Sequence, residues 1–129
     1  MGFTINRSLH ADFDAVIDRM VAALKAEGFG ILSDIDVQAT MKAKLGIDDF
    51  GRYRILGACN PPIAHVALTA EPNIGVMLPC NVVVRETSGG HVEIAAINPV
   101  AAIGAVGNPA LDALAGDVAA RLSRAVAAA

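Results

Sequence analysis

The segment that most constrains the fold is a predicted β-hairpin over residues 82–97. It begins with the apolar run Val82-Val83-Val84, and residues 91–97 have the alternation of a partner strand. Ser88-Gly89-Gly90 lies between them and is typical of a tight turn, because glycine adopts left-handed conformations at little cost. Two strands joined so closely are antiparallel neighbours. We therefore expect at least part of the sheet to be antiparallel.

The rest of the chain alternates between strand-like and helix-like segments. The spacing of apolar residues predicts strands over 2–8, 29–35, 53–58 and 74–86, helices over 12–27, 36–46, 61–71 and from 109 to the end, and a short helical turn over 99–106. The resulting order is β-α-β-α-β-α-β-β-α. This order alone permits a doubly wound parallel sheet or an α+β sheet with helices on one face. The hairpin and the long terminal helices favour α+β.

Length and composition indicate a single domain over residues 1–129. A chain of 129 residues suits one domain with one core, and 54% hydrophobic with 18% charged residues argues against disorder. Aromatic residues make up only 4%, so the core must be built mainly from aliphatic side chains. We find no internal repeat and no linker.

Charge and hydropathy patterning argue against two classes of partner. A net charge of -3 and few aromatic residues oppose nucleic-acid binding, which requires basic surface and stacking platforms. No apolar run reaches the roughly 20 residues that a membrane-spanning helix needs, and the N-terminus lacks the apolar core of a signal peptide. We therefore expect a cytoplasmic protein with reduced cysteines that binds neither nucleic acid nor membrane.

Cys59 lies where a predicted strand runs into a predicted helix. The stretch YRILGACNPP covers residues 53–62, and Asn60 followed by Pro61 is typical of a helix start. A thiol at this position is near unpaired N–H groups and the positive end of the helix dipole, which lower the pKa of a cysteine. Alternatively, Cys59 is a small apolar residue packed at the end of a strand.

Cys80 belongs to a second Cys-Asn step, in VMLPCNVVV at residues 76–84. Alternation places Cys80 on the same strand face as Val82 and Val84, which favours a structural role. If the two Cys-Asn steps are adjacent in space, two thiols and two amides surround one small pocket, suited to an anion, a soft metal ion or a sulfur-bearing ligand. Two thiols are too few for a usual structural zinc site, and the three histidines share no metal-ligand spacing. We therefore assign no metal-binding or catalytic residue, and the cofactor is unknown.

The blocks RILGACNPP and LPCNVVV, preceded by SDIDVQATMKAKLG, resemble the small bacterial family called domain of unknown function 302. The resemblance extends from about Phe3 to the C-terminal helix. It implies a compact α+β domain with an antiparallel sheet, similar to the TATA-binding-protein-like fold, and a homodimer. It implies no established activity.

Three hypotheses of function remain open at this point. The first is a homodimeric domain that binds a small molecule or an anion near the two Cys-Asn steps. The predicted ligand-binding residues are Cys59, Asn60, Cys80, Asn81, Lys42 and Arg54, the last two as partners of an anion. The second is a thiol-based redox enzyme or sensor with Cys59 as nucleophile and Cys80 as resolving thiol. The third is a purely structural or interaction homodimer with both thiols buried.

Overall fold

The computed structural model describes residues 2–129, and within them five strands form one sheet. The strands are β1 (Thr4–His10), β2 (Gly30–Asp36), β3 (Tyr53–Cys59), β4 (Cys80–Glu86) and β5 (His91–Ile97). They are arranged in the order β1-β5-β4-β3-β2, and each strand is antiparallel to its neighbours. The predicted hairpin is confirmed as β4 and β5, joined by a short 3₁₀ turn, η2 (Ser88–Gly90).

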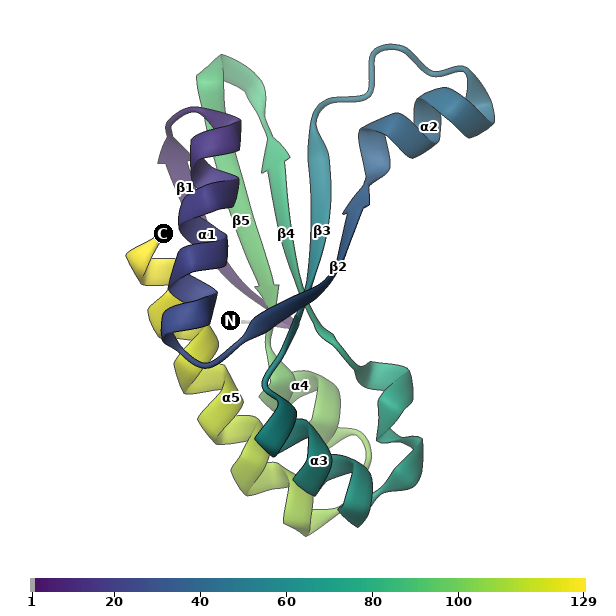
Figure 1. Cartoon of the computed structure of the whole chain (residues 1–129), viewed down its shortest axis with the longest axis vertical. Helices are drawn as coiled ribbons and strands as arrows, with labels where there is room; N and C mark the ends of the chain where they lie inside the picture. The colour runs from purple at the N-terminus through teal and green to yellow at the C-terminus, as the bar shows by residue number, and fades with distance from the viewer. Residues whose placement is uncertain (1) are drawn as a thin grey trace.

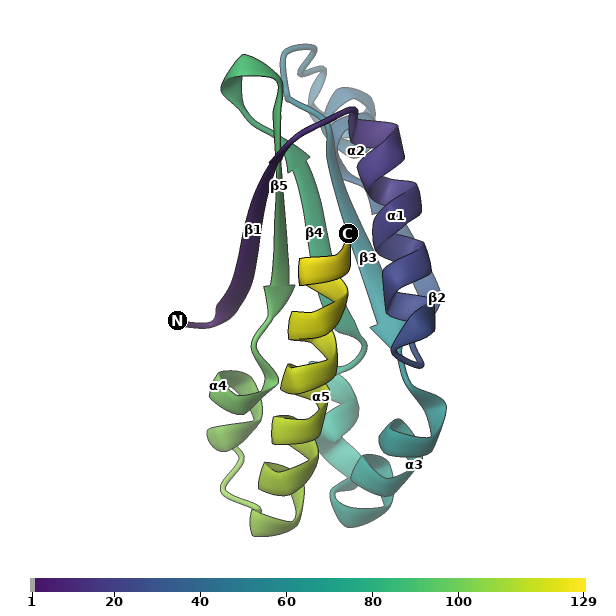
Figure 2. The same cartoon turned by 90° about the vertical axis from the view of Figure 1, so that its left-hand side faces the viewer.

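The two long helices, α1 (Phe13–Ala26) and α5 (Pro109–Ala128), pack on the same face of the sheet (Figures 1 and 2). The described part of the chain leaves the opposite face without a helix (Figure 2). The helices α3 (Pro61–Ala70) and α4 (Pro99–Gly104) lie beyond one end of the strands, and α2 (Val37–Leu45) projects near the other end (Figure 1). The prediction of an α+β fold with an antiparallel sheet and helices mainly on one face is therefore confirmed. Within residues 2–129, no helix has both the length and the apolar character needed to cross a membrane.

One predicted strand, residues 74–86, is wrong at its start. Residues Pro72–Met77 form a 3₁₀ helix, η1, and the strand begins only at Cys80. Proline has a fixed φ and no N–H for a sheet ladder, so Pro72 and Pro79 keep this segment out of the sheet. Apolar side chains of this segment, which suggested a strand, instead line a cavity beyond the end of β4.

The main hydrophobic core lies between the sheet and the two long helices. The helix predicted over residues 12–27 is confirmed, and the apolar residues that suggested it face the core, with Val16, Met20 and Leu24 fully buried. A smaller cluster of Ala67, Ile74 and Leu111 lies beyond the strand ends, among α3, η1 and α5. The candidate site lies between these two apolar clusters.

Candidate functional site

The junction between β3 and α3 forms as the sequence predicts. Cys59 is the last residue of β3, and Asn60 is the N-cap of α3. The side-chain oxygen Oδ1 of Asn60 accepts a hydrogen bond from the N–H of Ile63 at 3.2 Å. The polar side chain of Asn60 therefore holds the helix start in place and lies at the edge of the site.

The start of α3 offers fewer hydrogen-bond donors than a usual helix N-terminus. Pro61 and Pro62 occupy its first two positions and carry no N–H. The N–H of Ile63 is used by the Asn60 side chain, and the N–H of Ala64 donates to the Asn60 carbonyl at 2.9 Å. The expectation that unpaired N–H groups surround Cys59 is therefore wrong, because the two prolines carry no N–H and the N–H groups of Ile63 and Ala64 are both hydrogen-bonded to Asn60.

Cys80 begins β4, on the strand next to that of Cys59. Ala58 is directly opposite Cys80 in the ladder, so the two cysteines lie on neighbouring strands and one residue out of register. Cys80 packs against the main core, as alternation with Val82 and Val84 predicts. Burial among these apolar side chains, with a smaller contribution from the nearby Cys59, raises the pKa of the Cys80 thiol from 9.0 to about 11. Cys80 is therefore a neutral thiol at physiological pH.

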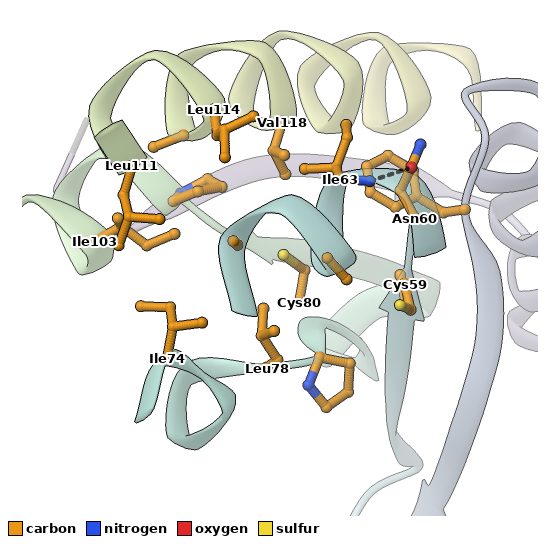
Figure 3. A pocket seen from close by; sticks show the side chains of 17 residues that line it. Cys59, Asn60, Ile63, Ile74, Leu78, Cys80, Ile103, Leu111, Leu114 and Val118 are labelled. Atoms are coloured by element: carbon orange, nitrogen blue, oxygen red, sulfur yellow. Dashed lines mark hydrogen bonds between the residues drawn. The ribbon is translucent and has the colours of Figure 1, made fainter. Parts of the chain in front are cut away.

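Both cysteines line a cavity of about 50 Å³ at the end of the sheet. Figure 3 shows Leu114 and Val118 reaching into it from α5, with Ile74 and Leu78 on the opposite wall and Cys80 between them. Among the described residues, those that line this cavity include no charged side chain. The remaining labelled side chains of the lining are Asn60, Ile63, Ile103 and Leu111. The cavity is thus an apolar chamber whose polar side chains, among the described residues, are two thiols and one amide.

The structure brings together three of the six predicted ligand-binding residues, namely Cys59, Asn60 and Cys80. Asn81 follows Cys80 in β4 and therefore points to the other side of the sheet, where it lines a groove on the uncovered face. The two Cys-Asn steps are adjacent, but they do not present two amides to one pocket.

The two predicted cationic partners lie away from the cavity. Arg54 is near the start of β3, so its Cα is roughly 16 Å along the strand from that of Cys59. Its guanidinium is paired with the carboxylate of Asp34, whose pKa it holds below the ordinary value. Lys42 is an exposed residue of α2, with its Nζ 4.0 Å from Asp48. Neither cation is available to an anion beside the cysteines.

The sequence interpretation did not identify the apolar walls of the cavity. The stripe of Leu111, Leu114 and Val118 was visible as helical spacing, and it correctly indicates one buried face of α5. Spacing does not reveal that the first turns of this helix extend past the strand ends, where they pack against α4 and α3 instead of the sheet. Ile74 and Leu78 were assigned to a strand, so their role in lining the cavity was missed, although Pro72 and Pro79 were signals against a strand here.

Comparisons with known proteins agree with the fold and name no activity. The family model "Domain of unknown function DUF302" matches residues 5–129. A similar structure is the crystal structure of an uncharacterized conserved DUF302 protein from Bacillus stearothermophilus, with a TM-score of 0.89 and 30% sequence identity over 97% of this chain and 96% of that chain. No curated protein matches the chain. The family match and the structural match both extend over nearly the whole sequence, and the chain therefore belongs to the DUF302 family.

Proposed function

We propose that this protein binds a small, uncharged ligand in the cavity beside Cys59 and Cys80. The observation that carries the proposal is a chamber that lacks charged lining residues within residues 2–129 and holds two thiols in an apolar wall. Ligand sites are typically apolar concavities with a few polar groups that orient the ligand. Here those groups are the two S–H groups and the Asn60 amide.

The electrostatics of the cavity favour a neutral ligand over an anion. An anion that leaves water for an apolar site needs charged partners or several hydrogen bonds to compensate for lost hydration. The start of α3 has its N–H groups used or replaced by proline, and Arg54 is engaged with Asp34. Burial raises the pKa of the Cys80 thiol to about 11, so this thiol is uncharged at neutral pH. Of the two ligand classes in the first hypothesis, a neutral small molecule therefore has more support than an anion.

The size of the cavity limits the ligand. A cavity of about 150 Å³ in another protein accommodates benzene, whereas this one measures about 50 Å³. A ligand of a few heavy atoms fits without movement of the walls. Sulfur is polarisable, and the two thiols would favour a soft, polarisable ligand over a strongly hydrated one.

Xenon is a suitable probe, because it is neutral, polarisable and comparable in size to the cavity. We expect xenon to shift the amide NMR signals of residues that line the cavity, and inorganic sulfate to leave them unchanged. Ala115→Leu fills the chamber from α5 and should abolish the xenon shifts, whereas Ala113→Leu, at an exposed position of the same helix, should retain them. If sulfate shifts the cavity signals and xenon does not, the proposal of a neutral ligand is wrong.

The alternative of a thiol-based redox enzyme has less support from the site. A resolving cysteine attacks as a thiolate, and a pKa of about 11 leaves very little Cys80 thiolate at neutral pH. The cytoplasmic, reducing location expected from the sequence would keep both thiols reduced, as the ligand proposal requires.

We also propose that two copies of the chain pair through the projecting arm formed by β2 and α2. In the described chain, α2 has no buried residue, and a nine-residue helix is too short to be stable by itself in water. Leu32 and Leu45 are each 68% exposed. Pairing with a second copy would bury this apolar surface. Leu45→Glu should then shift the mass in light scattering towards the monomer, whereas Ala43→Glu, at an exposed position nearby, should leave it unchanged. A monomeric mass for the wild type would refute this proposal.

A further inference from the structure

Two histidines that are far apart in the sequence face each other at the end of the sheet opposite the cavity. His10 ends β1 and His91 begins β5, and the two residues are directly opposite in the antiparallel ladder. Their ring centroids are 5.1 Å apart, with the ring planes at 75°. This end of β5 adjoins the β4–β5 turn, while α3 and α4 lie at the other end of the molecule (Figure 1). The pair is therefore separate from the proposed ligand cavity.

We propose that His10 and His91 together form a binding site for a divalent first-row transition-metal ion. Imidazole nitrogens bind such ions at about 2.0–2.1 Å, which places each ring centre roughly 3.2 Å from the ion. Two rings that subtend about 90–110° at the ion then have centres about 4.5–5.2 Å apart. The observed separation of 5.1 Å is within this range. Binding requires the two exposed rings to turn about their side-chain bonds so that one nitrogen of each points at a shared ion.

The surroundings of the pair leave room for an ion. Both side chains are exposed, so an ion reaches them without opening the fold. Gly90 lies beside the Nε2 atom of His10, and a Cβ at this position would be 3.3 Å from that nitrogen. Glycine therefore keeps the space next to one of the two donor nitrogens open.

The site has two protein ligands, which determines its chemistry. Within residues 2–129, no group of three His, Cys, Asp or Glu side chains could hold a metal ion. The nearest carboxylate on this face along β5 is Glu93, and it is held by Arg85 at 3.2 Å and by Asn6 at 3.4 Å. Water completes the coordination, so the ion is open to exchange. Imidazole favours Zn²⁺, Cu²⁺ and Ni²⁺, whereas Mg²⁺ and Ca²⁺ prefer oxygen ligands and are not expected to bind.

Zn²⁺ alone is the probe for this site, measured by isothermal titration calorimetry and by amide NMR shifts. We expect one Zn²⁺ per chain, with shifts concentrated at the ends of β1 and β5. His10→Asn and His91→Asn should each weaken Zn²⁺ binding by about tenfold or more, because the second imidazole acts as an intramolecular ligand with a high effective concentration. His65→Asn is the matched control, since His65 is an exposed histidine on α3.

The zinc experiment separates a shared site from other zinc contacts. If His10→Asn or His91→Asn retains the affinity of the His65→Asn variant, the two rings do not share an ion. Shifts that are centred on Cys59 and Cys80 would assign the metal to the thiols and refute the proposal. Absence of Zn²⁺ binding to the wild type would also refute it. All the substituted histidines are exposed, so the variants are expected to fold, and thermal unfolding checks this.

Discussion

Ionisation of Cys80 should destabilise the folded protein at alkaline pH, and the size of the effect follows from the burial of its thiol among apolar side chains. The folded state raises the pKa of this thiol from 9.0 to about 11, chiefly because apolar neighbours penalise the thiolate. One pKa unit corresponds to about 1.36 kcal/mol, so a rise of about two units corresponds to about 2.7 kcal/mol. Because the folded state holds the proton more tightly than the unfolded chain, this stabilisation is complete below about pH 9 and is lost as the pH rises through about 11.

The assay for this effect is urea unfolding of the wild type and of Cys80→Ala at a series of alkaline pH values. Other titrating groups affect both proteins, so the difference between their free energies of unfolding isolates Cys80. We expect the wild type to lose about 2–3 kcal/mol more than the variant between about pH 8 and pH 11.5. Cys59→Ser should retain most of this loss, because burial is the larger cause of the shift. If the difference between the two free energies of unfolding does not change with pH, the thiol is hydrated in the folded state. The description of the cavity as an apolar chamber would then be wrong.

Three further predictions concern the fold around the site. Asn60→Ala removes the cap that accepts the N–H of Ile63 and should lower the free energy of unfolding by about 1 kcal/mol in urea titrations, with the cavity-lining NMR signals shifted; an unchanged unfolding midpoint would contradict this. Leu122→Ala, at a fully buried position, should cost about 2–5 kcal/mol by the same assay, and a cost of less than about 1 kcal/mol would mean that α5 is not packed as described. Because Arg54 holds the pKa of Asp34 below 3.8, their pairing contributes stability that is present above this pH and lost in more acidic solution. Asp34→Asn should therefore unfold with a smaller dependence on pH in the acid range, and an unaltered acid profile would refute the contribution of the pair.

Much of the fold could be predicted from local patterns. The helix that begins after Asp12, the capped start at Asn60 and the hairpin around Ser88-Gly89-Gly90 all depend on residues within one or two turns of chain, and all three are confirmed. The strand predicted over residues 74–86 was wrong at its start, because a short apolar run has the same pattern in a strand and in a buried 3₁₀ helix. There, the prolines were better indicators than the hydropathy.

The candidate site was only partly predictable. Adjacency of the two Cys-Asn steps was a possibility that their spacing could not decide, and in the structure Cys59, Asn60 and Cys80 do line one cavity. Asn81 does not line this cavity, because successive strand residues point to opposite faces and its side chain lies on the other face of the sheet. Arg54 lies too far along β3 from Cys59 to reach the cavity. Its pairing with Asp34 on the neighbouring strand depends on strand order, which no local pattern could show.

By itself, the sequence determined the elements, their order and the antiparallel hairpin, because caps, turns and apolar periodicity act over a few residues. Tertiary structure alone decided which surfaces meet. It placed the first turns of α5 beyond the sheet, which closes a cavity over Cys80, and it paired β1 with β5, which brings His10 opposite His91 across 81 positions of sequence. Such contacts depend on strand order and register, and these are set by the burial of the whole apolar surface rather than by any single segment.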